Sequence, residues 1–267
     1  MEMKPFLEVI KNELPDVAAI IDILKIELPV EELSLSELLE KAENKKNEGN
    51  LKESLAYFAL ALELDKRSTF IMQRIVLLTY KIGEPDKRTA LKLAEGLLVK
   101  YLRPDEVIDV ETFGLSGAIY KRLAEIENEK ENIDKSIKYY EKGYLVCGDY
   151  YNGINCAYMY LLSATKQESE FEKIANYANA RKAWLNVIDI CDKELQRISN
   201  DPSNKNIVWI LQSKAEAMFG LNSGETSSEL QDLFIKIEKL DNQFERDAFQ
   251  SQHEKMKELL KTMPVIK

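Results

Sequence analysis

The chain has 267 residues, of which 45% are hydrophobic and 31% are charged, and it contains only 10 Gly and 7 Pro. Few glycines and prolines with a high share of charge argue against a β-sandwich, a β-barrel or a disordered chain and favour long helices. The net charge of −9 makes the chain a poor non-specific partner for nucleic acid, which requires clustered Lys and Arg.

Histidine and cysteine are too scarce for most metal and redox chemistry. The chain has one histidine, His253, and three cysteines, with no Cys-x-x-Cys and no cluster at zinc-ligand spacing. We therefore expect no metal and no cofactor. Sparse, odd cysteines and an N-terminus without an apolar signal region predict a cytoplasmic location. No window approaches the roughly 18 apolar residues of a membrane span, so no membrane association is expected.

The hydrophobic pattern has a helical period nearly throughout, and caps and breakers divide it into about thirteen helices without a strand. Asp16 is predicted to cap an early helix, and Ser34-x-x-Glu37 has the form of a capping box. Gly83 and Gly148 suit the position just after a helix. The predicted helices span residues 5–14, 17–28, 35–49, 51–65, 70–82, 87–102, 110–127, 133–147, 151–164, 169–198, 202–221, 227–240 and 244–260.

The stretch 169–198 has two interpretations. Its apolar residues recur at spacings of three and four, and Ser169-x-x-Glu172 can cap it, which favours one helix about 45 Å long at roughly 1.5 Å per residue. The alternative is a break near residues 176–179, because Asn favours caps and turns.

Residues 35–66 carry a spacing of small and aromatic residues that is typical of helical-hairpin repeats. Ala42, Ser54 and Ala61 take the small positions, and Phe58 takes the aromatic position. Small residues let two helices approach closely, and the aromatic ring fills the gap to the next pair. This segment resembles a tetratricopeptide repeat, which is a hairpin of about 34 residues.

A second, longer match covers residues 117–146, and a looser one covers residues 69–101. In the second match the structural positions fall on Gly117, Tyr120, Ser136, Tyr140 and Gly143. The sequence thus predicts an all-α fold, a right-handed α-solenoid of degenerate tetratricopeptide-like hairpins over residues 30–267. Residues 1–29 are predicted to form an N-terminal helical cap or tether.

Residues 111–122 place two glycines inside a predicted helix, at a cost of roughly 1 kcal/mol each relative to Ala. Such a cost indicates that something packs closely against that face. One reading is a neighbouring helix. The other is a ligand or peptide that lies across the glycines and is held by Glu111 and by Lys121 or Arg122.

Residues 149–155 are polar and aromatic at a helix start, and they too allow two readings. The structural reading is a capping and interhelical network, with Asp149 as the cap. The functional reading is a ligand or anion site at the helix N-terminus. The candidate binding residues here are Asp149, Tyr150, Tyr151, Asn152 and Asn155.

The segment Trp209-x6-Glu216-Ala-x-Phe219 is a third unusual stretch. We expect Trp209 and Phe219 to be core aromatics. Glu216 lies on the same predicted helix and is expected to pair with a buried Lys or Arg.

Four motifs along the chain carry a family resemblance: Glu-Thr-x-Gly-Leu-x-Gly-x-Ile-Tyr-Lys-Arg, Ser-Ile-x-x-Tyr-x-x-Gly-Tyr, Asp-Tyr-Tyr-x-Gly-Ile-Asn and Trp-x6-Glu-Ala-x-Phe. Together they resemble the TRAFs-binding region of the apoptosis-signal-regulating MAP kinase kinase kinases and stand-alone bacterial tetratricopeptide proteins with the same domain. The resemblance covers about residues 70–260. It implies a helical solenoid that binds other proteins and primes a signalling partner. The sequence has no kinase signature.

The sequence predicts a non-catalytic scaffold or regulatory adaptor that binds a partner protein or peptide on a concave surface, in a signalling or defence system. The alternative is a small-ligand sensor, for a nucleotide or an anion, or an enzyme, with a polar pocket near residues 111–122 and 149–155. Catalysis is disfavoured because the one histidine, His253, lies in a polar stretch and is expected to be solvated. Self-association through an exposed end of the array is a third reading.

Overall fold

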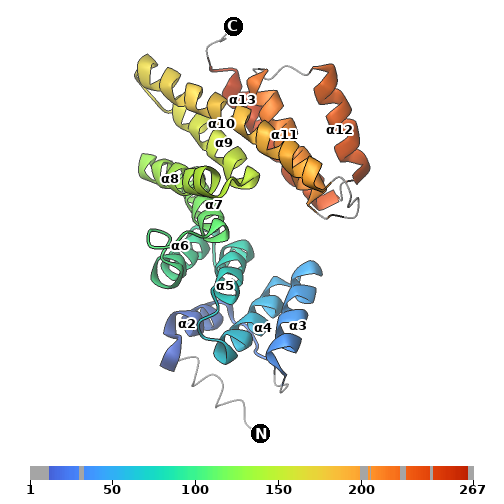
Figure 1. Ribbon diagram of the computed structural model, residues 1–267. Coiled ribbons are helices and arrows are strands. Elements are labelled where there is room, and N and C mark those ends of the chain that lie inside the picture. Colours follow the sequence, from blue (N-terminus) through green and yellow to red (C-terminus); the bar gives the residue numbers. More distant parts are fainter. Residues whose placement is uncertain are drawn as a thin grey trace. The chain divides into compact units, whose positions relative to one another are not determined.

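The computed structural model describes residues 12–29, 33–198, 204, 206–222, 227–240 and 243–263, with the backbone alone for residues 243–248. Within these residues the regular secondary structure consists of α-helices and a short π-helical turn (Figure 1). The chain divides into two compact units, residues 1–128 and 129–267. Within each unit most helices pack against the next helix in sequence, as in tetratricopeptide repeats, so the predicted all-α fold is confirmed.

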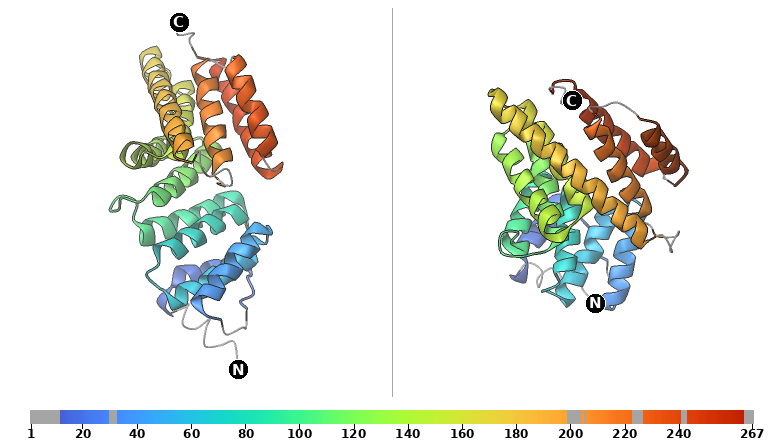
Figure 2. Two further views of the ribbon diagram at one scale, coloured as in Figure 1. Left: turned by 45° about the vertical axis from the view of Figure 1, so that its right-hand side comes forward. Right: turned by 45° about the horizontal axis from the view of Figure 1, so that its top comes forward.

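Unit 1 is a stack of helices in sequence order, and two further views show the same neighbours (Figure 2). It contains α2 (Pro15–Leu24), α3 (Leu35–Asn47), α4 (Leu51–Leu64), α5 (Thr69–Ile82), α6 (Lys87–Leu97), the π-helical turn η1 (Leu98–Leu102) and α7 (Val110–Glu127). Helix α4 packs between α3 and α5, and α7 packs against α5 and α6. Helix α2 packs against α4 and α6.

The first predicted repeat is the hairpin of α3 and α4. At the point where these helices cross, the Ser54 hydroxyl donates a hydrogen bond to the Ala42 carbonyl oxygen at 2.8 Å. Ala42, Ser54, Phe58 and Ala61 are all completely buried, as their repeat positions predict. The small side chains bring the two helices close enough for a side chain of one to reach the backbone of the other.

Local signals located the start of α3 well and the start of α2 badly. The capping box is present, because Ser34 accepts from the Glu37 amide and its own amide donates to the Glu37 carboxylate at 2.8 Å. The prediction that Asp16 caps a helix over residues 17–28 is wrong, since α2 begins at Pro15 and ends at Leu24. Asp16 instead pairs with Lys100 and accepts from the Tyr101 hydroxyl at 2.6 Å. These bonds, Lys100 first, lower the pKa of Asp16 and tie α2 to η1.

Unit 2 contains α8 (Lys130–Cys147), α9 (Tyr150–Thr165), α10 (Glu170–Arg197), α11 (Ile207–Leu221), α12 (Ser228–Leu240) and α13 (Gln243–Leu260). Helix α9 packs against α8 and α10, and α11 packs against α9, α10, α12 and α13. Helix α10 runs unbroken for 28 residues, so the alternative with a break near residues 176–179 is wrong. Tyr177 and Trp184, both fully buried on α10, meet edge to face with ring centroids 6.4 Å apart.

Some predicted elements lie outside the described residues. These are most of the predicted helix 5–14, the helix start at Asp201-Pro202 and the cap at Thr226. The predicted division of the chain at residue 29 stays a prediction.

The structural positions of the second predicted repeat are also buried: Gly117, Tyr120, Ser136, Tyr140 and Gly143. In unit 2, α8 and α9 approach so closely at Gly143 that a β-carbon there would lie 2.5 Å from Cγ of Asn152. The same constraint recurs at Gly220, where a β-carbon would lie 2.5 Å from the buried ring of Trp184. Because glycine has no side chain, it leaves free the space that a side chain of the neighbouring helix occupies.

The prediction that Trp209 is a core aromatic is wrong. Its side chain, on α11, is 38% exposed, whereas Phe219 on the same helix is buried as predicted. The two residues lie ten positions apart and the pattern of α11 is apolar on most sides, so periodicity alone did not separate the exposed face from the buried one.

The three cysteines differ in environment. Cys156 and Cys191 are buried, Cys147 is exposed at the end of α8, and none forms a disulfide. Burial raises the pKa of the Cys191 thiol to about 12 and also raises that of Cys156. The two buried thiols are therefore protonated core side chains at neutral pH.

Gly143→Ala should destabilise the protein by about 1–3 kcal/mol, because the new methyl group overlaps Asn152. Asn152 cannot retreat easily, since its side chain is 1% exposed and its Nδ2 donates to Asp149 at 2.7 Å. The measurement is urea unfolding of the full chain followed by circular dichroism.

Gly96→Ala is the matched control, because Gly96 lies in α6 with no atom within 4 Å of its added β-carbon. It should stabilise the protein by about 0.5–1 kcal/mol through helix propensity alone. Equal stability of the two variants would contradict the close approach at Gly143.

Candidate functional site

Cations of three helices of unit 1, α3, α5 and α7, lie close enough to act on one another. Lys46 lies in the last turn of α3 and Lys81 in the last turn of α5. Positive side chains are favoured there by the helix macrodipole. On α7, predicted site residue Arg122 donates to the Ala118 carbonyl at 2.9 Å, and its guanidinium carbon lies 5.0 Å from the centroid of the Tyr80 ring.

A groove of about 460 Å³ opens beside these cations, and we call it the basic groove. Helix α5 and the residues just after it, α6 and α7 all contribute to its lining, which includes Tyr80, Lys81, Lys87, Arg122, Glu125 and Ile126. Of the described residues that line it, three are cations and one is a carboxylate. The groove is thus locally positive in a chain whose net charge is −9.

Lys81 is a cation of the groove whose charged form is disfavoured by its surroundings. Its side chain is open to solvent, yet the surrounding helices remove part of its hydration. This desolvation, followed by the positive charges of Arg122, Lys46 and Arg74, lowers the pKa of Lys81. Across the part of the chain that the structure describes, no carboxylate pairs with Lys81. An anion bound here would relieve repulsion among these cations.

The predicted site residue Glu111 has a protein partner. Its carboxylate accepts from Nη1 of Arg74 at 3.0 Å, while Nε of Arg74 lies 3.5 Å from Glu43. Glu43 also pairs with Lys46. Arg74 and Lys46 therefore have acidic partners, whereas Lys81, Lys87 and Arg122 line the groove. Lys121 is half-buried on α7 beside Arg122.

The predicted site residues of unit 2 form a capping network. Asp149 accepts from both the backbone amide and Nδ2 of Asn152 at 2.7 Å. Nδ2 of Asn155 donates to the Tyr151 carbonyl at 2.9 Å. These contacts match the structural reading of residues 149–155. A ligand at this helix start, and a pocket shared with residues 111–122, stay predictions.

The aromatic residues of this segment pack within unit 2, and Tyr151 connects α9 to α8. Burial raises the pKa of Tyr150 to about 12, so its phenol is protonated at neutral pH. The Tyr151 ring meets the ring of Tyr140 edge to face with centroids 6.5 Å apart. On α11, the buried carboxylate of Glu216 accepts from Nε2 of Gln252 at 3.2 Å, a partner that the sequence did not indicate.

A second hollow lies between α12 and α13 in unit 2, and sequence reasoning missed it. It measures about 440 Å³, and we call it the aromatic pocket because Phe234, Phe249 and His253 line it. His253 is not a solvated helix residue as predicted: it is half-buried, with its ring centroid 4.0 Å from that of Phe219. Phe249 and His253 are four residues apart on one helix, and that spacing could have indicated a shared aromatic face.

Metal and membrane functions find no support in the described part of the chain. Among those residues no three His, Cys, Asp or Glu side chains gather to hold a metal ion. None of the helices in the same residues is long and apolar enough to cross a membrane.

The comparison with protein families gives one match. Residues 34–160 match the family model Tetratricopeptide Repeats-Sensor. This range contains both predicted repeats and every residue of the basic groove, and it supports the prediction of a tetratricopeptide module that binds proteins or acts as a sensor. Comparisons with curated proteins and with solved structures gave no match.

The free energy of unfolding should decrease as the pH is lowered below 6.5, because of His253. Burial lowers its pKa below 6.5, while Glu254 raises it and Lys257 lowers it by smaller amounts. The unfolded chain therefore binds more protons near pH 6. The stability gained from the neutral imidazole is present above pH 6.5 and is lost as pH falls below that value.

The measurement is urea unfolding between neutral and mildly acidic pH, in the native chain and in His253→Phe. Because the chain has one histidine, the difference between the two profiles isolates this group. Removal of the imidazole should flatten the profile near pH 6. Parallel profiles would show that His253 is solvated after all.

Proposed function

We propose that the chain is a non-catalytic protein-interaction module, a scaffold or regulatory adaptor that binds an acidic segment of a partner protein in the basic groove. The observation that carries this proposal is the lining of the groove, in which Lys81, Lys87 and Arg122 stand beside one described carboxylate, Glu125. Binding of a carboxylate would replace like-charge repulsion with attraction. The match of residues 34–160 to a tetratricopeptide family supports protein binding in general.

The groove also has apolar surface that could bind an apolar residue of the partner, next to the partner's acidic residue. Ile126 on α7 is 45% exposed and lines the groove together with the Tyr80 ring. An aliphatic side chain of the partner would cover both and bury apolar surface. We therefore propose a segment in which Asp or Glu stands next to an aliphatic residue.

The resemblance to the TRAFs-binding region of the apoptosis-signal-regulating kinases supports a regulatory role. In that reading, the module recruits or primes an effector of a signalling or defence system. The motifs of the resemblance include Arg122, which lines the basic groove, and Lys121, which precedes it in the sequence. This role, like the absence of catalysis, is part of the proposal.

The test is selection of a randomised peptide library on the full chain, followed by affinity measurements with the selected peptides. We expect acidic-aliphatic peptides whose binding weakens with added salt. Lys81→Glu should weaken binding by on the order of tenfold or more, since it turns attraction into repulsion. Lys121→Glu should also weaken binding.

The matched control is Arg67→Glu, which reverses an exposed charge between α4 and α5, away from the lining of the groove. It should bind like the native chain. Selection of basic or uncharged peptides, or equal binding by Lys81→Glu, would count against the groove as the site.

The second candidate function is a sensor of a nucleotide or another small anion. Two observations favour it: the matched family is described as a sensor, and the groove volume of about 460 Å³ suits a small molecule. A thermal-shift screen with nucleotides and inorganic phosphate separates the two functions, because a ligand that binds only the folded state raises the melting temperature. A shift that Lys81→Glu abolishes would favour the sensor, and no shift with any anion would remove it.

A further inference from the structure

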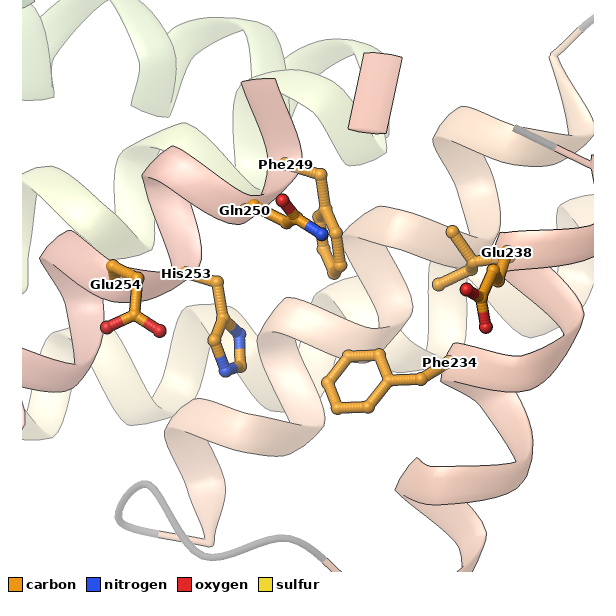
Figure 3. A pocket seen from close by; sticks show the side chains of 7 residues that line it. Phe234, Glu238, Phe249, Gln250, His253 and Glu254 are labelled. Carbon is orange, nitrogen blue, oxygen red and sulfur yellow. The ribbon is translucent and has the colours of Figure 1, made fainter. Parts of the chain in front are cut away.

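The aromatic pocket of unit 2 has no part in the proposed function of unit 1. Its lining comes from two helices: Phe234, Ile237 and Glu238 from α12, and Phe249, Gln250, His253 and Glu254 from α13. Figure 3 shows the rings of Phe234, Phe249 and His253 together at the centre, with Glu254 on one side and Glu238 on the other.

The three rings form a tight, angled group. Ring centroids of Phe234 and His253 are 5.6 Å apart at an interplanar angle of 85°, and those of Phe234 and Phe249 are 6.0 Å apart at 61°. Phe249 and His253 complete the triangle at 6.1 Å. The three rings line the pocket and are half-buried, so part of each ring remains open to it.

Among the described residues that line the pocket, the charged ones are two exposed carboxylates, Glu238 and Glu254, and none is a lysine or arginine. Lys257, one turn further along α13, is the nearby positive charge that acts on His253. The faces of aromatic rings carry negative electrostatic potential, and the imidazole of His253 is neutral at neutral pH because burial lowers its pKa. Rings and carboxylates together would therefore attract a cation and repel an anion.

We propose that the aromatic pocket binds a small quaternary-ammonium compound, with the methyl groups against Phe234, Phe249 and His253 and the charge near Glu238 and Glu254. A quaternary ammonium suits this site better than a metal ion or a primary amine. It has a weakly held hydration shell and no hydrogen atoms to donate, so contact with ring faces costs it little. The volume of about 440 Å³ is in the range of small-molecule sites.

The test uses choline and its uncharged carbon isostere, in which a tert-butyl group replaces the trimethylammonium. Both are titrated into the full chain by calorimetry. The two molecules have nearly the same shape, so the difference in affinity reports the charge. We expect choline to bind tighter by on the order of tenfold. Equal affinity, or binding of the isostere alone, would overturn the proposal.

A second readout locates the binding. Because His253 is the one histidine in the chain, its imidazole resonances can be followed directly by NMR during the titration. A cation held against the ring should shift these resonances and lower the pKa of His253 further, since it disfavours a second positive charge. Choline binding that leaves the imidazole unchanged would place the ligand elsewhere and overturn the proposal.

Two variants complete the test. Phe234→Leu removes one ring face and should weaken choline binding by on the order of tenfold, whereas Phe171→Leu, at an 81% exposed site on α10, should not change it. Glu254→Gln removes an exposed charge without a change of shape, so it tests the site even where Phe234→Leu perturbs the packing of α12. Native affinity in both pocket variants, or tighter binding of a trimethyl-lysine peptide than of choline, would overturn the assignment to a small ligand.

Discussion

The close approach of neighbouring helices is the constraint on which the rest of the structure depends. Each unit buries its apolar side chains only because certain positions carry almost no side chain: Ala42 beneath Ser54 in unit 1, and Gly143 and Gly220 in unit 2. Where the helices meet at these points, longer side chains further along fill the remaining space. The spacing of small residues therefore sets the positions of the helices, and the helices set the positions of the charged and aromatic groups.

The basic groove shows how such a stack produces a local field unlike that of the whole chain. Helix dipoles favour cations at C-terminal ends, and α3 and α5 of unit 1 each carry such a cation in the last turn. Glu43 and Glu111 pair with Arg74, while Lys81, Lys87 and Arg122 line the groove. An acidic chain can thus carry a locally positive surface, and association responds to the local rather than the net charge.

Most of the fold could be predicted from the sequence, because caps, breakers and repeat positions act within a few residues of one another. The capping box at Ser34 is such a local signal, and it was predicted correctly. Contacts between distant segments were not predictable: Asp16 meets Tyr101, and His253 meets rings from two other helices. The exposed position of Trp209 was missed because α11 is apolar on most sides. Of the residues that line the basic groove, the sequence singled out Arg122 but not Lys81, because the place of Lys81 depends on helices brought together by the fold.

The unequal burial of the three cysteines has a practical and a chemical consequence. Cys147 is exposed at the end of α8, whereas Cys156 and Cys191 lie in the core with raised thiol pKa values. Only the thiolate form of cysteine reacts readily with alkylating agents, so thiol alkylation of the folded chain should be confined to one atom, the sulfur of Cys147. Unit 2 thus has a single natural attachment point for a spectroscopic label, and no cysteine has to be removed to create it.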